Sequence, residues 1–280
     1  MDRLRPPAVA GSFYPSDSRK LNELLDDCFF SNPLGPQGIK SAAGIFAGLV
    51  PHAGFVYSGP CAAHLYASLD PSIRRIIMIG VNHRARGARA ALSRCEYWET
   101  PFGNVPVDQD ANDFLQTRVD FLQRDDVAHE REHSIEVQLP FLQRRLEDFA
   151  FVPISLSDLS LQECEKIGAA VAELYESETS RQRKTAILAS TDLNHYLSPR
   201  EIDELDRTAL EPVLGLDPAG LMNIVEKESL TMCGFIPTAV MLMAANALGA
   251  KRAQLLKHCH SGDVSRMDEV VGYASVALER

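Results

Sequence analysis

The sequence lacks the features of membrane-spanning, secreted and nucleic-acid-binding proteins. No run of about 18 apolar residues occurs, which excludes a transmembrane helix. The segment from Met1 to Pro15 contains two adjacent prolines and no apolar core of signal-peptide length, so we expect a cytoplasmic protein. No basic run is longer than a few residues and the net charge is −10, which argues against nucleic acid as a partner.

The sequence also lacks a Cys-x-x-Cys motif, although it contains six cysteines. They are spaced singly along the chain, at Cys28, Cys61, Cys95, Cys164, Cys233 and Cys259. Single spacing in a chain of this length indicates reduced thiols in a reducing compartment, not a disulfide framework. We expect most of them to be small, buried hydrophobic residues.

What the sequence does contain is an alternation of apolar runs and helical patterns over 280 residues, 45% of them hydrophobic. Strands are predicted at Ile45–Val50, Arg75–Gly80, Phe149–Ser155, Lys184–Ala189 and Val270–Ala277. Helices are predicted to begin near Ser16–Asp17 and to span Pro60–Ser68, Gln109–Arg118, His133–Asp148, Leu161–Glu176, Pro199–Leu210, Pro218–Glu228 and Phe235–Leu248.

This alternation predicts an α/β fold, in which a central, mostly parallel or mixed sheet carries helices on both faces. Pro140 falls inside one predicted helix and is expected to kink it, because proline removes a backbone donor. No break in composition demands a second domain, so we expect one domain over residues 1–280.

Polar side chains of ligand type follow three of the predicted strands. His52 comes just after the first strand, His83 after the second, and Asp192 and His195 after the fourth. Ligands in open α/β sheets bind at the carboxyl ends of strands. Each histidine alone is as well explained by an ordinary loop residue, but three at strand ends favour a common functional pocket.

Cys233 is a further candidate because it directly precedes a predicted helix. The helix dipole and free backbone N–H groups are expected to lower the pKa of its thiol and to favour the metal-binding thiolate. By itself it is better explained as a buried structural cysteine, and only the histidines make it a plausible ligand. We therefore expect His52, His83, Asp192, His195 and Cys233 to converge at one edge of the sheet.

Two other histidine motifs are less convincing as sites. Residues 129–133 match His-Glu-x-x-His, but this zinc-protease motif works only on a helix. The preceding residues have no apolar face, so we expect His129 in an exposed or mobile loop and His133 at the start of a helix. His258 and His260 would share one face of a strand and give poor geometry for a compact site.

Several ordered boxes across nearly the whole chain resemble those of the Memo family, called AmmeMemoRadiSam system protein B in microbes. The boxes are Pro6–Pro15, Pro51–Gly59, Gly80–His83, Glu132–Leu142, Ser190–His195, Met232–Pro237 and Val271–Ala277. The resemblance implies a fold similar to class III extradiol dioxygenases (LigB-like), which hold non-haem iron.

The resemblance also implies roles for individual residues. His52, His83 and Cys233 match a metal pocket that takes iron or copper, and zinc also suits such a mixed donor set. His195 matches a catalytic acid or base and Asp192 the acidic residue beside it, whereas His133 and Glu136 match pocket residues without an assigned role. The cysteine replaces the carboxylate of the dioxygenase triad, which puts extradiol activity in doubt.

Three functions remain open on these grounds. The first is a metal-dependent oxidoreductase, similar to a dioxygenase, that acts on a small molecule and uses iron(II) in preference to copper or zinc. The second is a binding or adaptor protein that reuses the pocket for a peptide or metabolite. The third is a hydrolase or thiol-redox enzyme that uses Cys233. Microbial members of the family imply AMMECR-type and radical SAM proteins as partners.

Overall fold

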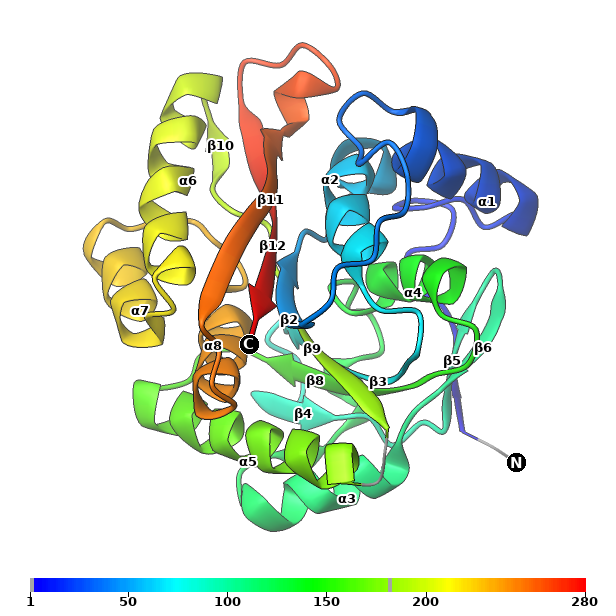
Figure 1. The fold of residues 1–280 in the computed structure, drawn as a ribbon, viewed down its shortest axis with the longest axis vertical. Coiled ribbons are helices and arrows are strands. Elements are labelled where there is room, and N and C mark those ends of the chain that lie inside the picture. Colours follow the sequence, from blue (N-terminus) through cyan, green and yellow to red (C-terminus); the bar gives the residue numbers. More distant parts are fainter. Residues whose placement is uncertain (1–2, 181–182) are drawn as a thin grey trace.

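A central sheet with helices on both faces forms the body of the molecule, as predicted (Figure 1). The structure is a computed structural model, and it describes residues 3–180 and 183–280. Within these residues the main sheet has nine strands, in the order β10-β12-β2-β9-β3-β8-β4-β7, with β11 paired to β12. A separate small sheet has the order β1-β5-β6.

Four parallel strands form the middle of the main sheet, which is mixed overall. They are β2 (Ile45–Val50), β9 (Lys184–Ser190), β3 (Ile73–Val81) and β8 (Ala150–Leu156). On one side β12 (Val270–Glu279) pairs antiparallel with β2, β10 (His195–Leu197) and β11 (Arg252–His260). On the other side β4 (Ala90–Leu92) pairs antiparallel with β8 and parallel with β7 (Gln123–Arg124). The small sheet consists of β1 (Leu4–Arg5), β5 (Tyr97–Thr100) and β6 (Gly103–Pro106).

The helices divide between the two faces (Figure 1). One face is covered by α1 (Ser18–Asp26), the π-helical segment η1 (Asp27–Ser31), α2 (Phe55–Ser68) and α4 (Leu139–Arg145). The other is covered by α3 (Gln109–Arg118), α5 (Leu161–Ser180), α6 (Pro199–Leu214), α7 (Pro218–Lys227) and α8 (Phe235–Ala247). The remaining short helical turns are η2 (Asp126–Ala128), η3 (Glu136–Gln138) and η4 (Ser261–Asp263).

Strand β3 shows why the sheet has two apolar faces. Its side chains alternate between the two hydrophobic cores, with Ile77 and Ile79 in one and Ile76 and Met78 in the other. Side chains in a strand point alternately to opposite faces, so a fully apolar run must be covered on both. With both faces covered, ligands in such sheets bind at the carboxyl ends of the parallel strands.

The helix predicted over His133–Asp148 is wrong in its extent. The chain forms a turn at His133, then η3, and the α-helix begins only at Leu139. Pro140 lies in the first turn of that helix and does not kink it, because the N–H that proline lacks has no partner there. The predicted strands also omit β11, whose polar and apolar residues alternate at a partly exposed edge.

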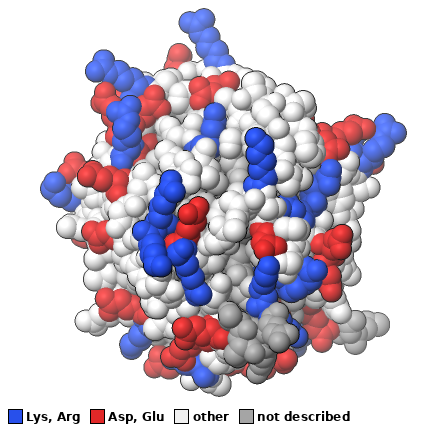
Figure 2. All heavy atoms as spheres, viewed as in Figure 1, with Lys and Arg blue, Asp and Glu red and all other residues white. Residues whose placement is uncertain are grey.

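The surface carries charges of both signs. On the face shown in Figure 2, Lys and Arg side chains are interspersed with Asp and Glu side chains. Among the described helices, none is both long and apolar enough to cross a membrane. Of the six cysteines, four are buried and two, Cys95 and Cys233, are half-buried, and all are free thiols.

Candidate metal centre

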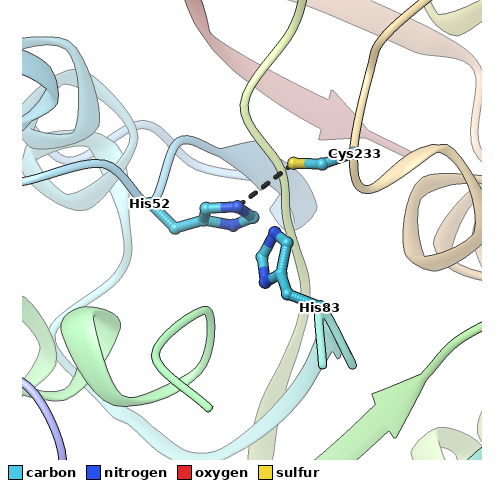
Figure 3. Close-up of side chains that lie close together, drawn as sticks. All are labelled: His52, His83 and Cys233. Carbon is cyan, nitrogen blue, oxygen red and sulfur yellow. Dashed lines mark hydrogen bonds between the residues drawn. The ribbon is translucent and has the colours of Figure 1, made fainter. Parts of the chain in front are cut away.

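Two histidines and a cysteine from three distant segments meet at the carboxyl edge of the main sheet (Figure 3). His52 follows β2, His83 follows β3, and Cys233 precedes α8. One donor atom from each lies within 4.8 Å of the other two. His52 Nε2 is 3.2 Å from Cys233 Sγ, and the rings of His52 and His83 lie edge to face with centroids 5.0 Å apart.

The hydrogen bonds around His52 determine which ring nitrogen carries the proton. The Ser190 hydroxyl donates to the Ser134 carbonyl at 2.6 Å, so its oxygen is an acceptor toward His52 Nδ1 at 3.0 Å. Nδ1 therefore carries the hydrogen, and Nε2 offers its lone pair toward Cys233. The His52 backbone N–H also donates to Asp192 Oδ1 at 2.7 Å. His52 is therefore a neutral imidazole whose Nε2 lone pair is available to a metal.

His83 is held in the same tautomer by a different partner. Its Nδ1 lies 2.9 Å from Glu132 Oε1, and a carboxylate only accepts, so the hydrogen resides on Nδ1. Figure 3 shows the other ring nitrogen of His83 facing His52 and Cys233. A histidine that donates from one nitrogen to a carboxylate and offers the other is the usual arrangement of a metal-ligating imidazole.

His195 lies at the same edge but outside the three-residue donor group. Its Nδ1 faces the Thr231 carbonyl at 3.1 Å, and its backbone N–H donates to the Thr231 hydroxyl at 2.8 Å. A carbonyl only accepts, so Nε2 of His195 is also free. Burial lowers the pKa of this imidazole, which keeps it neutral and able to accept a proton.

Cys233 reaches His52 because a glycine follows it. A Cβ atom at Gly234 would lie 2.4 Å from the Thr191 side chain, so only glycine lets α8 begin this close to β9. The expected low pKa of the thiol is wrong for the metal-free protein. Burial and the Asp192 carboxylate raise the pKa of Cys233, and they outweigh the hydrogen bonds that lower it.

Asp192 is buried and supports the site from the backbone side. Its carboxylate accepts the His52 N–H at 2.7 Å, and its side chain is 5% exposed. Burial raises the pKa of this carboxyl to about 7, although the hydrogen bond from His52 opposes the shift. Near neutral pH, Asp192 can therefore hold or release a proton beside the donor group.

The two pocket residues without an assigned role are placed differently. The His133 ring stacks on that of His83 with centroids 4.7 Å apart and lies edge to face with His52. Glu136 is fully buried and accepts from Arg5 Nη1 and Tyr14 Oη, both at 2.7 Å. His133 thus borders the donor group, whereas Glu136 anchors the N-terminal segment.

The His-Glu-x-x-His stretch does not form a protease site. His129 lies in a turn after η2 and is 1% exposed, so the expectation of an exposed or mobile loop is wrong. Its ring packs against Trp98, and it belongs to none of the possible metal groups found among the described residues. His258, in β11, instead approaches the buried Asp206 carboxylate at 2.9 Å.

Comparison with known proteins identifies the family of this chain. The sequence pattern of the family described as Memo-like protein matches residues 5–277. A MEMO1 family protein of Methanopyrus kandleri is 39% identical over 99% of both chains. MEMO1 family proteins of Methanosarcina mazei and Pyrobaculum arsenaticum are each 39% identical over at least 99% of each chain. The chain belongs to the Memo family.

Three supporting residues of this Memo-family pocket were not singled out from the sequence. They are Glu132, Ser190 and Thr231, which hold His83, His52 and His195 in turn. Ser190 and Glu132 fall inside boxes shared with the family, but nothing in their spacing distinguishes them from their neighbours. Only the folded backbone brings each of them to a ring nitrogen.

Proposed function

We propose that the chain binds one divalent transition metal through His52, His83 and Cys233 and acts as a metal-dependent oxidoreductase on a small molecule. The observation that carries the proposal is the preorganised donor set, in which three donor atoms lie within 4.8 Å of one another. Hydrogen bonds to Ser190 and Glu132 leave an Nε2 lone pair free on each imidazole. Three protein donors leave open positions, which a catalytic metal needs.

The donor chemistry favours iron or copper over magnesium or calcium. Imidazole and thiolate are intermediate to soft ligands, whereas magnesium and calcium prefer carboxylate, carbonyl and water oxygens. Copper binds such sites more tightly than iron, so affinity alone would not select iron(II). Its selection in the cell would have to come from metal availability. Zinc also fits two imidazoles and a thiolate, and it serves as the redox-inactive comparison.

Iron held by His52, His83 and Cys233 would supply redox chemistry, and the chain's own groups would accept and release protons. Cys233 loses its thiol proton when it becomes a ligand, because only the thiolate binds metal. His195 accepts a proton from bound substrate at Nε2, since Nδ1 is held by the Thr231 carbonyl. The buried Asp192 carboxyl keeps the charge of the pocket in balance.

Anaerobic iron(II) binding tests the proposal. We expect wild type to bind about one iron per chain, and we expect His52→Ala, His83→Ala and Cys233→Ser each to weaken binding at least tenfold. His64→Ala is a matched control, because that half-buried imidazole binds the Leu34 carbonyl elsewhere in the fold. Cys95→Ser, at the other half-buried cysteine, controls for loss of a thiol.

Oxygen uptake with catechol-like and indole-like compounds then tests the reaction. Uptake that needs iron and disappears in His195→Ala supports an oxidoreductase. Equal, weak iron binding by wild type and all three ligand variants contradicts the metal site. That result would favour a binding or adaptor protein that uses the same pocket.

A further inference from the structure

Glu132 is a buried carboxylate placed between two imidazoles of the pocket. Its side chain is 3% exposed, and its Oε1 atom lies 2.9 Å from His83 Nδ1 and 3.3 Å from His133 Nδ1. The two rings stack at an interplanar angle of 16°. Glu132, His83 and His133 also have donor atoms close enough to hold a metal, so two roles compete for this carboxylate.

Backbone hydrogen bonds favour the positioning role over the metal-ligand role, because they already occupy the carboxylate oxygens of Glu132. Oε1 accepts the backbone N–H groups of His133 and Ser134 at 2.8 and 2.9 Å, and Oε2 accepts that of His83 at 2.8 Å. Together with the His83 Nδ1–H, Oε1 accepts from three donors. A metal at this position would have to displace hydrogen bonds that the fold makes without it.

The partners of the Glu132 carboxylate in these hydrogen bonds are all donors. They are the Nδ1–H of His83 and the backbone N–H groups of His83, His133 and Ser134. A carboxylate offers only acceptor oxygens and makes a stronger hydrogen bond than a neutral acceptor does. The carboxylate therefore favours the His83 tautomer that carries its hydrogen on Nδ1.

We propose that Glu132 is a positioning residue that fixes His83 as the Nδ1–H tautomer and turns the Nε2 atom of His83 toward the metal centre. The metal part of this proposal rests on the proposed function, whereas the tautomer part does not. The carboxylate also makes the His83 ring a better electron donor. The His133 ring lies beside the donor group by stacking on the His83 ring, and only its backbone N–H donates to Glu132.

Long-range ¹H–¹⁵N spectra of the metal-free protein test the tautomers directly. In wild type we expect His83 to show a single Nδ1–H tautomer. In Glu132→Ala, this ring should show a mixture of tautomers, because its acceptor is gone. Glu130→Ala is the matched control, since its side chain is 62% exposed and two residues away. Unchanged tautomers in Glu132→Ala would overturn the proposal.

Anaerobic iron(II) affinity, measured by chelator competition, tests the coupling to the metal centre and needs only the milder Glu132→Gln variant. We expect affinity to fall by about 10- to 100-fold, as for other outer-shell carboxylates. In a His83→Ala background the same substitution should cost nothing further, because Glu132 acts through His83. An equal loss in both backgrounds contradicts this positioning role.

The two experiments also separate this proposal from the proposed function. If the tautomers respond as expected but wild type binds no iron, the metal function fails and the positioning role stands. If wild type binds two metals and Glu132→Gln binds one, Glu132 is itself a ligand and the positioning role is wrong.

Discussion

His129 illustrates how a sequence motif can mislead at the scale of a single residue. The motif placed it beside His133 as a possible zinc ligand, yet its ring is buried against Trp98. The nearby Ala91 carbonyl does not meet the geometry of a hydrogen bond, and among the described residues neither ring nitrogen has a partner. Such a histidine destabilises the folded state, because its ring nitrogens lose their hydrogen bonds to water and gain none in the protein.

We predict that His129→Phe is at least as stable as wild type at pH 7.5 and increasingly more stable at lower pH. Burial, followed by the charge of Arg5, lowers the pKa of His129 to about 4, from near 6.5 in the unfolded chain. As the pH falls below 6.5, the unfolded chain binds the proton first, so wild type loses stability. The difference should approach about 3 kcal/mol near pH 4, at roughly 1.4 kcal/mol per pH unit.

Urea unfolding of both proteins between pH 4 and 8 measures this difference. A difference that does not change with pH would show that His129 is not held neutral. Iron binding should be equal in the two proteins, because His129 is not part of the donor group.

At the scale of elements, strand β10 contains a bulge between His195 and Leu197, beside the candidate metal centre. His195 and Leu197 pair with consecutive residues of β12, which leaves Tyr196 unpaired between them. Tyr196 has a φ of 59°, a left-handed conformation that costs energy for a side chain of this size. Its side chain is 72% exposed, so packing does not explain the conformation. The bulge redirects the chain at His195 toward Thr231.

We predict that Tyr196→Gly is more stable than Tyr196→Ala by about 1 kcal/mol, because glycine alone adopts the left-handed conformation without strain. Both variants lose the ring, so the comparison isolates the backbone. At Arg200, an exposed position in α6, the order should be reversed. Arg200→Ala should be more stable than Arg200→Gly by a similar amount. Thermal unfolding of the four variants gives the result, and equal stability at position 196 would exclude backbone strain there.

The N-terminal segment is joined to the pocket segment by a buried ion pair. Arg5 and Glu136 are 3% and 0% exposed and lie 2.7 Å apart, and the backbone N–H groups of Ala8 and Val9 also donate to Glu136. Removing one partner of such a pair leaves an uncompensated buried charge. The pair and these two hydrogen bonds together hold the N-terminal segment against the segment that contains Glu136.

We predict that Glu136→Gln lowers the free energy of unfolding by about 3 to 5 kcal/mol, since Arg5 keeps its charge without a counter-ion. Glu204→Gln removes the partner of Arg200 in an exposed pair and should cost less than about 1 kcal/mol. Urea unfolding at neutral pH measures both. A loss at Glu136 no larger than that at Glu204 would mean that the buried pair does not hold the segment.

The sequence predictions were most accurate for elements with a clear pattern of apolar residues. The β2 limits were predicted fully, because all six residues are buried and apolar and turn residues border them. The limits of helix α3 were also predicted fully. In the structure Asp108 is its N-cap. The helix prediction failed for the segment from His133 to Gln138. Its residues are buried by contacts with β3 and the N-terminal segment and not by a helical face. The proximity of His52 and His83 followed from their positions after two parallel strands of the same sheet, but their hydrogen-bond partners depended on tertiary contacts.

At the scale of the whole molecule, the two hydrophobic cores share one sheet. The same strand β3 contributes Ile77 to one core and Ile76 to the other. Neither layer of helices can separate without exposing one face of these strands to water. The single domain expected over residues 1–280 stays a prediction, which unfolding experiments can test.

We predict a single cooperative unfolding transition that is the same for two different probes. Trp98 is the only tryptophan and belongs to the same hydrophobic core as residues of α2 and α4, so its fluorescence reports on one layer. Far-UV circular dichroism is dominated by all helices, including α5 and α8 of the opposite layer. Because β3 and its neighbours belong to both cores, loss of either layer removes the support of the other. The urea midpoints from the two probes should therefore coincide. A fluorescence midpoint clearly below or above that of circular dichroism would show that the layers unfold separately and that the chain is more than one cooperative unit.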